Sequence, residues 1–167
     1  MKTLLIRRLS LLFIFGAAIA LAPGCDGDSP AAPTLPEGEV VPVEIYAAQN
    51  SGLSMQEQRL VRTQAAFDAL LEDIFGDDGV ADGVVPPDFN IDMVLAVASG
   101  EKPDACYSIE ISEASADGTD LTVTVTETEP TADCACAAVL VQPVLVVHVP
   151  RADAVRFFVT TSFTCAS

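Results

Sequence analysis

The sequence predicts an α+β fold that is mainly antiparallel β, a single compact sheet or sandwich with one covering amphipathic helix. Three observations lead to this fold class. Alternating apolar and polar residues flank Asp117-Gly118, a dipeptide typical of β-hairpin turns. An almost continuous apolar run covers residues 91–98, and a helical apolar period covers residues 63–75. One helical segment among several strands indicates a sheet whose apolar face is covered by that helix.

The first predicted strand covers residues 40–48. Pro42 favours an edge position for it, because proline cannot donate a hydrogen bond to a strand ladder. A turn at residues 50–52 then leads to a short second strand at Leu60-Val61.

The helix is predicted over residues 63–75, with Thr63 as its N-cap and Gly76 as its C-terminal stop. Its apolar residues recur at helical spacing, which places them on one face: Phe67, Leu70, Leu71, Ile74 and Phe75. This apolar stripe needs a surface to cover, and the sheet is the surface available.

The apolar run at residues 91–98 is bounded by Asn90 and Gly100, and it predicts a central strand covered on both faces. The strands that follow are predicted as an antiparallel meander over residues 107–113, 121–128, 137–149 and 155–163. Pro143 marks a bulge or an edge in the third of these. The last strand is expected to place four apolar side chains on one face: Val155, Phe157, Val159 and Phe163.

An acidic segment, residues 77–88, joins the helix to the central strand. Its carboxylates raise the possibility of a calcium site. Their spacing does not match the alternating acidic ladder and distal glutamate of a calcium loop. The pattern therefore favours a solvated connector.

The charge of the chain is unbalanced after residue 25. Three of the eight Lys and Arg residues precede that position, whereas all 24 Asp and Glu residues follow it, so the remainder carries a net charge of −19. Such a charge repels phosphate backbones and anionic lipid. We therefore expect no nucleic-acid binding and no electrostatic docking to membranes.

Residues 1–24 have the pattern of a lipoprotein signal peptide. A basic start containing Lys2, Arg7 and Arg8 precedes an apolar segment at residues 11–21, and Ala22-Pro23-Gly24 stands before Cys25. This ending resembles a bacterial lipobox, so Cys25 is the expected site of lipidation. The alternative is ordinary cleavage that leaves a free thiol.

Several acyl chains on Cys25, palmitate among them, would anchor the protein durably. Residues 25–39 are rich in proline, glycine and acidic residues and predict a tether. The expected location is the bacterial cell envelope, on its periplasmic or outer face, with the lipid as the sole contact to the membrane. Asp26 favours retention in the inner membrane by resemblance to enterobacterial sorting.

The four remaining cysteines are Cys106, Cys134, Cys136 and Cys165. An even number in an exported protein favours disulfides over a zinc site. A bond between Cys134 and Cys136 would close a strained small ring. In the predicted meander all four cysteines lie at one end of the sheet. We therefore expect Cys106 to pair with one of Cys134 and Cys136, and Cys165 with the other.

The sequence contains no recognisable catalytic motif. The one histidine, His148, lies in a predicted strand, and no nucleophile elbow, zinc-protease motif or glycine-rich phosphate loop occurs. Neither enzymatic activity nor a cofactor is expected.

Several short motifs resemble the C-terminal domain of PrcB-like proteins in residue type, order and spacing. They are Asp88-Phe89, Met93-Val94, Gly100-Glu-Lys-Pro103, the segments 107–111 and 123–125, Glu129-Pro130, Gln142-Pro143 and Val149-Pro150. The resemblance covers about residues 60–163, within a single predicted domain at residues 40–167. It departs at Asp104-Ala105-Cys106, where the family usually has Thr-Gly-Gly.

The type member of this family is a lipoprotein that stabilises a secreted protease complex. The resemblance thus implies a non-enzymatic module that binds or stabilises a partner protein, with a secreted protease as the candidate partner. The candidate partner surface consists of Lys102, Pro103, Asp104, Tyr107, Gln142 and Pro143. The simpler interpretation is that Tyr107 and Pro143 only pack and turn the chain.

Two other functions stay open. The loop before Tyr107 faintly resembles that of chagasin-type protease inhibitors, although those domains lack a helix such as the one predicted at residues 63–75. The acidic segment leaves open an envelope protein that binds calcium, a carbohydrate or another small ligand.

Overall fold

The computed structural model describes residues 34–35, 37–76 and 83–165. The predicted signal peptide, Cys25 and most of the tether lie outside these residues, as does the first half of the acidic segment, residues 77–82. Among the helices of the described part, none has both the length and the apolar character needed to cross a membrane.

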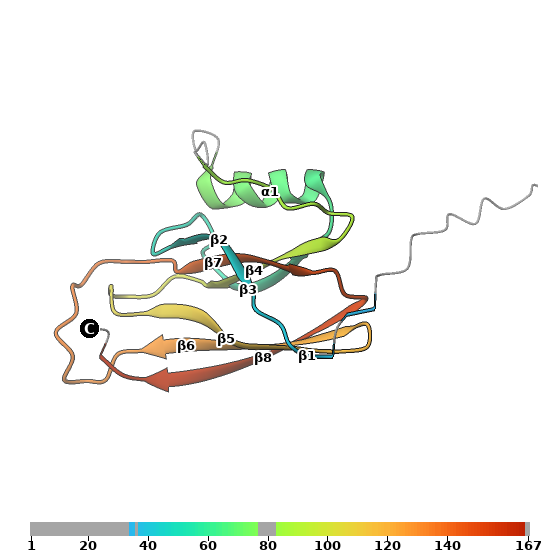
Figure 1. Ribbon diagram of the computed structural model, residues 1–167. Helices are drawn as coiled ribbons and strands as arrows, with labels where there is room; N and C mark the ends of the chain where they lie inside the picture. Colours follow the sequence, from blue (N-terminus) through green and yellow to red (C-terminus); the bar gives the residue numbers. More distant parts are fainter. Residues whose placement is uncertain (1–33, 36, 77–82, 166–167) are drawn as a thin grey trace, which may run out of the picture.

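Two four-stranded sheets pack face to face, and one helix covers the outer face of one of them (Figure 1). The lower sheet has the order β1-β5-β6-β8, and the upper sheet has the order β2-β7-β4-β3. In the lower sheet the strands are β1 (Gly38–Glu39), β5 (Ser108–Asp117), β6 (Asp120–Glu129) and β8 (Ala154–Phe163). In the upper sheet they are β2 (Val43–Ala48), β3 (Gln56–Val61), β4 (Asp92–Ser99) and β7 (Val144–Pro150), with α1 (Gln64–Phe75) above them.

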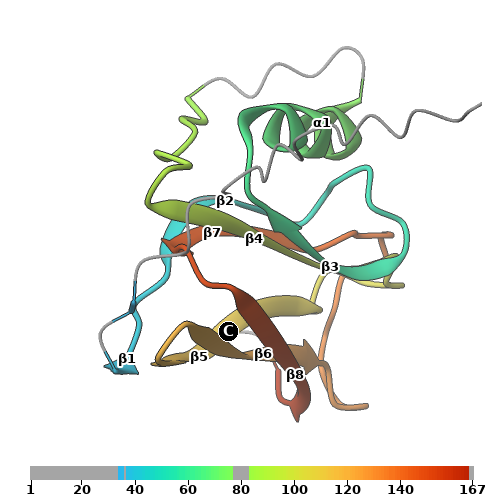
Figure 2. The same ribbon diagram turned by 90° about the vertical axis from the view of Figure 1, so that its right-hand side faces the viewer.

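The three layers seen in Figure 2 confirm the predicted fold class, with a sandwich rather than a single sheet. The central strand β4 explains the layering. Met93, Leu95 and Val97 point into the core between the sheets, whereas Val94 and Ala96 point toward the helix. An alternating strand that is apolar on both faces needs cover on both faces, as its sequence predicted.

The helix begins and ends where its caps predicted. The Thr63 hydroxyl accepts a hydrogen bond from the Ala66 amide at 3.3 Å, and the Gly76 amide donates to the Glu72 carbonyl at 2.7 Å. Phe67, Leu70 and Ile74 are buried against the upper sheet, while Leu71 and Phe75 pack beside them half-buried. Burial of this stripe holds the helix in place.

The hairpin of β5 and β6 is also confirmed. Gly118 has φ +64°, a left-handed conformation that glycine adopts without strain and that a tight hairpin turn requires. On β6, Leu121, Val123 and Val125 face the core, and the threonines between them face outward.

The predicted meander is wrong in two respects. The chain leaves the lower sheet after β6, adds β7 to the upper sheet, and returns as β8, which runs parallel to β6. The cause lies in residues 144–147, which are apolar on both faces and therefore belong in the doubly covered upper sheet. Residues 137–143 are not a strand but a loop, with one isolated bridge between Lys102 and Val141.

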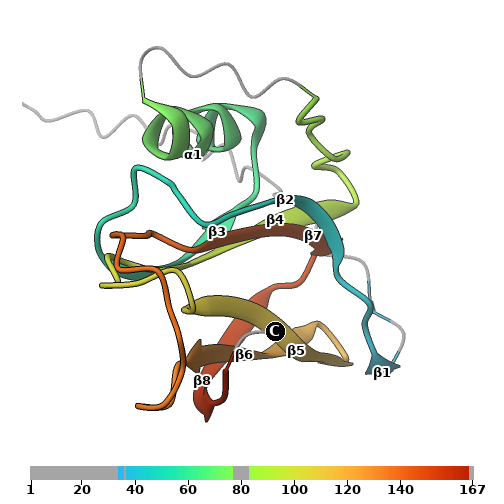
Figure 3. The ribbon, with the colours of Figure 1, turned by 90° about the vertical axis from the view of Figure 1, so that its left-hand side faces the viewer.

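The strands nearest the N-terminus belong to both sheets. Pro42 lies between β1 of the lower sheet and β2 of the upper sheet, and β2 is an edge strand, as predicted. Strand β3 is longer than expected. Its first four residues are polar, so their sequence did not indicate a strand, but polar residues fit an edge strand. Figure 3 shows β2 and β3 in the upper layer.

The last strand differs from its expected burial. Val155 and Phe157 pack against the core, but Val159 and Phe163 are exposed. Strand β8 is the edge of the lower sheet, and its second half extends past the apolar core.

Candidate functional site

Two long connections meet at one end of the sandwich. They are the β4–β5 connection at residues 100–107 and the β6–β7 connection at residues 130–143, and the chain end that follows β8 lies on the same side (Figure 1). Disulfides join Cys106 to Cys136 and Cys134 to Cys165, with Cα–Cα distances of 5.6 and 5.4 Å. This is one of the two pairings that the sequence left open. We call residues 100–107, 130–140 and Cys165 the disulfide rim.

The strand register explains why the cysteines meet. The first residue of β5, Ser108, lies opposite Thr128 near the end of β6, and the last residue of β8, Phe163, lies opposite Glu129. Because β6 and β8 are parallel, their C-terminal ends are neighbours. The cysteines therefore cluster as predicted, although the topology that brings them together is different.

Backbone hydrogen bonds add to the crosslinks. The amide of Lys102 donates to the Val141 carbonyl at 2.8 Å, the Val141 amide donates back at 3.0 Å, and Ala105 donates to Ala137 at 3.1 Å. The disulfides close loops with sequence separations of 30 and 31 residues. By lowering the entropy of the unfolded chain, each disulfide contributes about 2 to 4 kcal/mol to the stability of the fold. Two exposed loops are thus held in one conformation.

Where β4 enters the rim, Gly100 has φ +71°, and a Cβ atom there would lie 2.7 Å from the backbone nitrogen of Gln56. A larger residue would force the β4–β5 connection away from β3. The glycine of the Gly100-Glu-Lys-Pro103 motif therefore sets the direction in which this connection leaves the sheet.

The two loops of the rim enclose an open hollow of about 510 Å³. We call it the rim hollow; its lining residues are Pro103, Asp104, Tyr107, Pro130, Thr131, Ala132, Cys134, Cys136 and Ala138. Asp104 is the one charged residue in this lining, and its carboxylate accepts a hydrogen bond from the Cys106 amide at 3.0 Å. The hollow therefore offers apolar and neutral polar contacts rather than a charged pocket.

The Lys102 side chain makes contacts within the protein. Its Nζ lies 3.5 Å from the buried carboxylate of Glu127 and 5.4 Å from the ring centroid of Tyr107. The same carboxylate accepts a hydrogen bond from Gln56 Nε2 at 2.7 Å. Because Glu127 belongs to the lower sheet and Gln56 to the upper one, this cluster joins the two sheets at the rim end.

Gln142 and Pro143 do not line the rim hollow. Pro143 is buried, and the Gln142 backbone bonds to the β2–β3 connection: its amide donates to Gln49 at 2.7 Å, and its carbonyl accepts from the Ser51 hydroxyl at 3.0 Å. Of the six residues predicted for partner binding, the structure thus brings Pro103, Asp104 and Tyr107 together at the hollow.

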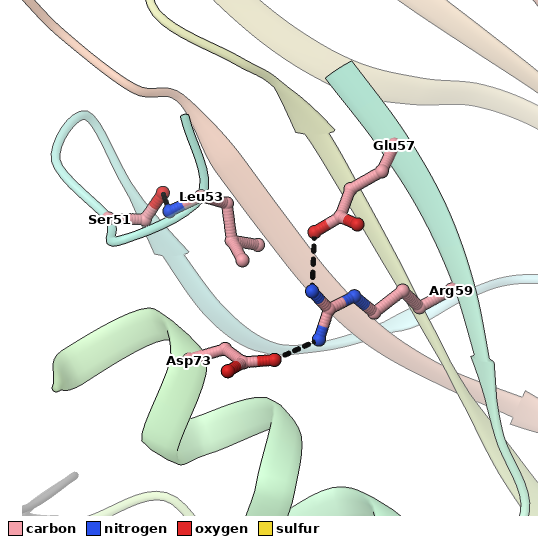
Figure 4. Close-up of polar contacts among 5 residues, drawn as sticks. All are labelled: Ser51, Leu53, Glu57, Arg59 and Asp73. Atoms are coloured by element: carbon pink, nitrogen blue, oxygen red, sulfur yellow. Dashed lines mark hydrogen bonds and ion pairs between the residues drawn. The ribbon is translucent and has the colours of Figure 1, made fainter. Parts of the chain in front are cut away.

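A second polar cluster lies where β3 meets the helix (Figure 4). Arg59 binds Asp73 of α1 and lies 2.9 Å from Glu57 of its own strand. The hydrogen bond that Arg59 donates to the Asp73 carboxylate is the main cause that raises the pKa of Arg59 above its usual value. We call this group of Glu57, Arg59 and Asp73 the helix clamp. Sequence reasoning missed the helix clamp because the polar half of β3 gave no strand signal.

Carboxylates near the disulfides do not make a metal site in the described part of the chain. The two groups with ligand-type atoms within 4.8 Å both depend on cysteines that are already in disulfides: Asp104, Cys106 and Cys136, and Asp133, Cys134 and Cys165. A disulfide sulfur has no thiolate to offer a metal ion. Of the acidic segment, Asp88 accepts hydrogen bonds from the amide and side chain of Asn90, which lower the pKa of Asp88.

His148 lies on β7 with its Nδ1 3.5 Å from Asp92. Within residues 34–35, 37–76 and 83–165, no serine, threonine or cysteine side chain forms a hydrogen bond with it. The geometry is that of a half-exposed strand residue beside an acidic neighbour.

Each of the five basic residues in the described part is engaged by the protein itself. Arg59, Lys102 and Arg156 bind carboxylates, while Arg62 donates to the carbonyls of Ala152 and Asp153, and Arg151 donates to that of Phe89. No basic side chain of these residues remains free to attract an anion. The surface potential is therefore negative, because it is set by the carboxylates that have no basic partner.

The comparisons with known proteins agree with the resemblance drawn from the motifs. A family model described as PrcB C-terminal matches residues 93–150, which run from β4 to β7 and contain both rim loops and three of the four disulfide cysteines. The searches of curated proteins and of solved structures gave no match. The segment from β4 to β7 is thus similar to the C-terminal domain of PrcB-like proteins.

Proposed function

We propose that this protein is an exported bacterial lipoprotein whose domain binds and stabilises a partner protein without catalysing a reaction, and that the partner is a secreted protease. The observation that carries the proposal is the rim hollow, an open depression whose lining residues all belong to the segment matched by the PrcB C-terminal model.

Exposed apolar side chains support protein binding at this place. Val139 and Leu140 follow the last lining residue of the hollow and are 51% and 61% exposed. Burial of such side chains contributes about 25 cal/mol per Å² of apolar surface. Because two disulfides already fix these loops, docking orders little additional chain, and more of that gain is retained as affinity.

The acidic surface supports a partner with basic or neutral contact residues. Opposite charges accelerate association and are screened by salt. The same charge disfavours nucleic acid. We therefore expect binding that weakens as ionic strength rises.

Lipidation of Cys25 and the tether at residues 25–39 complete the proposal. The lipid would hold the domain at the surface of the cell envelope, on its periplasmic or outer face. Confinement to a membrane raises the local concentration of a partner, so that a modest intrinsic affinity suffices.

The test is a crosslinked capture of the full-length protein from native membranes, read by mass spectrometry. The variant V139A/L140A removes the exposed apolar pair of the rim, and V85A/I91A removes an exposed pair outside the rim as a matched control. We expect one exported protease to be enriched with wild type and with the control, and lost with V139A/L140A. Recovery of the same abundant envelope proteins with all three forms would contradict the proposal.

A further inference from the structure

The two sheets end in four edge strands, and three of them are protected against pairing with another strand. Strand β1 has two residues, and β2 follows Pro42 and contains a bulge between Glu44 and Tyr46. Strand β3 carries Glu57 and Arg59, which are held in the helix clamp. Short strands, bulges, proline and charge are the usual means by which sheet edges avoid additional pairing.

Strand β8 lacks these features after Arg156. Its ten residues pair with β6 in an uninterrupted register, and no charged residue, proline or glycine occurs from Phe157 to Phe163. Figures 2 and 3 show it at the margin of the lower sheet opposite β1. In the described part of the chain, no strand pairs with its free side.

The backbone of β8 presents a regular set of free groups. The Thr164 amide donates to the Glu129 carbonyl at 3.1 Å, which continues the parallel ladder with β6. Successive residues of a strand direct their amide and carbonyl groups to opposite sides. Even-numbered residues of β8 therefore bond to β6, and the groups of Val159, Thr161 and Phe163 face the open side.

Apolar side chains accompany these groups. Phe158, Val159 and Phe163 are 56%, 43% and 66% exposed. Both ends of the strand are fixed, since the Asp153 amide donates to Thr119 at 2.8 Å and Cys165 is bonded to Cys134. An added strand would meet a template that is already ordered, which lowers the entropic cost of binding.

Charge indicates the occupant. The strand itself is neutral after Arg156, but exposed Asp153 lies at its start and exposed Asp133 lies beside Cys165 at its end. In an antiparallel pair of two copies, the Asp153 end of one would oppose the Asp133 end of the other, so that like charges would meet. A segment with an apolar centre and basic ends is complementary.

We propose that β8 accepts an extended segment of a partner protein as a fifth strand of the lower sheet, and that this segment carries apolar residues flanked by lysine or arginine. Main-chain hydrogen bonds would supply affinity, and the exposed side chains of β8 would supply selectivity. The inference rests on the proposed protein-binding function but assigns a contact separate from the rim hollow.

The test is hydrogen exchange at single-amide resolution on the full-length protein in lipid nanodiscs. The probe is a synthetic peptide of alternating valine and threonine between lysine pairs, compared with the same peptide carrying glutamate in place of lysine. We expect the lysine peptide to slow exchange by about tenfold or more at Val159, Thr161 and Phe163, with a weaker effect of the glutamate peptide.

Two variants of one position sharpen the test. V159P removes an outward amide without removing a bond to β6, and V159I keeps that amide as the matched control. We expect V159P to weaken peptide affinity about tenfold or more and V159I to preserve it.

Unchanged exchange at the three amides with both peptides would overturn the inference. Protection that appears without peptide and grows with protein concentration would also overturn it, because the occupant would then be a second copy. If a protease is captured through the rim while the β8 amides stay unprotected, the inference that β8 accepts a partner strand is refuted and the proposed function is not.

Discussion

The helix layer and the disulfide rim are held by different forces. The helix is fixed by the burial of Phe67, Leu70 and Ile74 against the upper sheet. No residue of 101–107 or 130–140 belongs to either buried apolar cluster of the described chain, and covalent bonds fix these loops instead. Where crosslinks replace a core, side chains remain free to face solvent. The region with the least burial is therefore the one suited to contact a partner.

The strongest test of this contrast is Phe67→Ala. Phe67 is among the most deeply buried large side chains, so its truncation leaves a cavity between the helix and the sheet. We expect the free energy of unfolding to fall by about 3 to 5 kcal/mol, measured by urea denaturation with the disulfides intact. A loss below about 1 kcal/mol would show that helix burial contributes little to the fold.

The converse change is Cys134→Ala combined with Cys165→Ala. We expect the free energy of unfolding to fall by about 2 to 4 kcal/mol, because the unfolded chain gains entropy. Hydrogen exchange should accelerate at residues 130–140 and at the end of β8, while the amides of α1 change only with global stability. Equal acceleration in the helix and the rim would remove the distinction between the two regions.

The Lys102–Glu127 pair is the polar link between the sheets at the rim. Lys102→Met keeps the aliphatic chain but leaves the buried Glu127 with one partner fewer. We expect the free energy of unfolding to fall by about 1 to 3 kcal/mol. Arg156→Met is the matched control, since Arg156 pairs with Asp120 at an exposed site. Its expected cost is below about 1 kcal/mol in the same urea assay. Equal losses would show that burial of Glu127 does not matter.

The smallest effect concerns Asp133 on the rim. A hydrogen bond from the Thr131 hydroxyl, at 2.7 Å, and then its own backbone amide hold the pKa of Asp133 below 3.8. Because this pKa is depressed, the interaction stabilises the fold above pH 3.8 and is lost as the pH falls through the lower pKa of the folded protein.

Thr131→Val should therefore raise the pKa of Asp133 toward 3.8 in a titration followed by carboxyl NMR. Asp88, whose pKa is lowered by Asn90, serves as an internal control and should not change. An unchanged pKa of Asp133 would contradict the assigned hydrogen bond.

Sequence reasoning succeeded where one local pattern decides the structure. The alternation around Gly118 identifies a hairpin, the doubly apolar run of β4 requires cover on both faces, and Thr63 begins a helix with an apolar stripe. It failed for β8, because an alternating strand has the same pattern whether it runs parallel or antiparallel to its neighbour. Its direction depends on β7, which joins the other sheet.

The candidate site was predictable to the same degree. The cysteines were expected at one end of the sheet, and strand ends bring them there, but Cys134 and Cys136 are too close in sequence for the pairing to be chosen. The separation of Gln142 and Pro143 from the rim hollow was not predictable, since it depends on hydrogen bonds to Gln49 and Ser51 of another connection. Nor does the sequence reveal that the Lys102 side chain forms an ion pair with Glu127.

The central claim is that the disulfide rim contacts a partner protein. The most direct measurement places a photoactivatable crosslinking residue at position 140 of the full-length protein in native membranes, and the same residue at position 91 in a second sample. Leu140 is an exposed residue of the rim, and Ile91 is exposed outside it. The account predicts that position 140 forms one dominant adduct with an exported protease and that position 91 does not. Adducts of equal yield and identity at both positions, or no adduct at position 140, would contradict it.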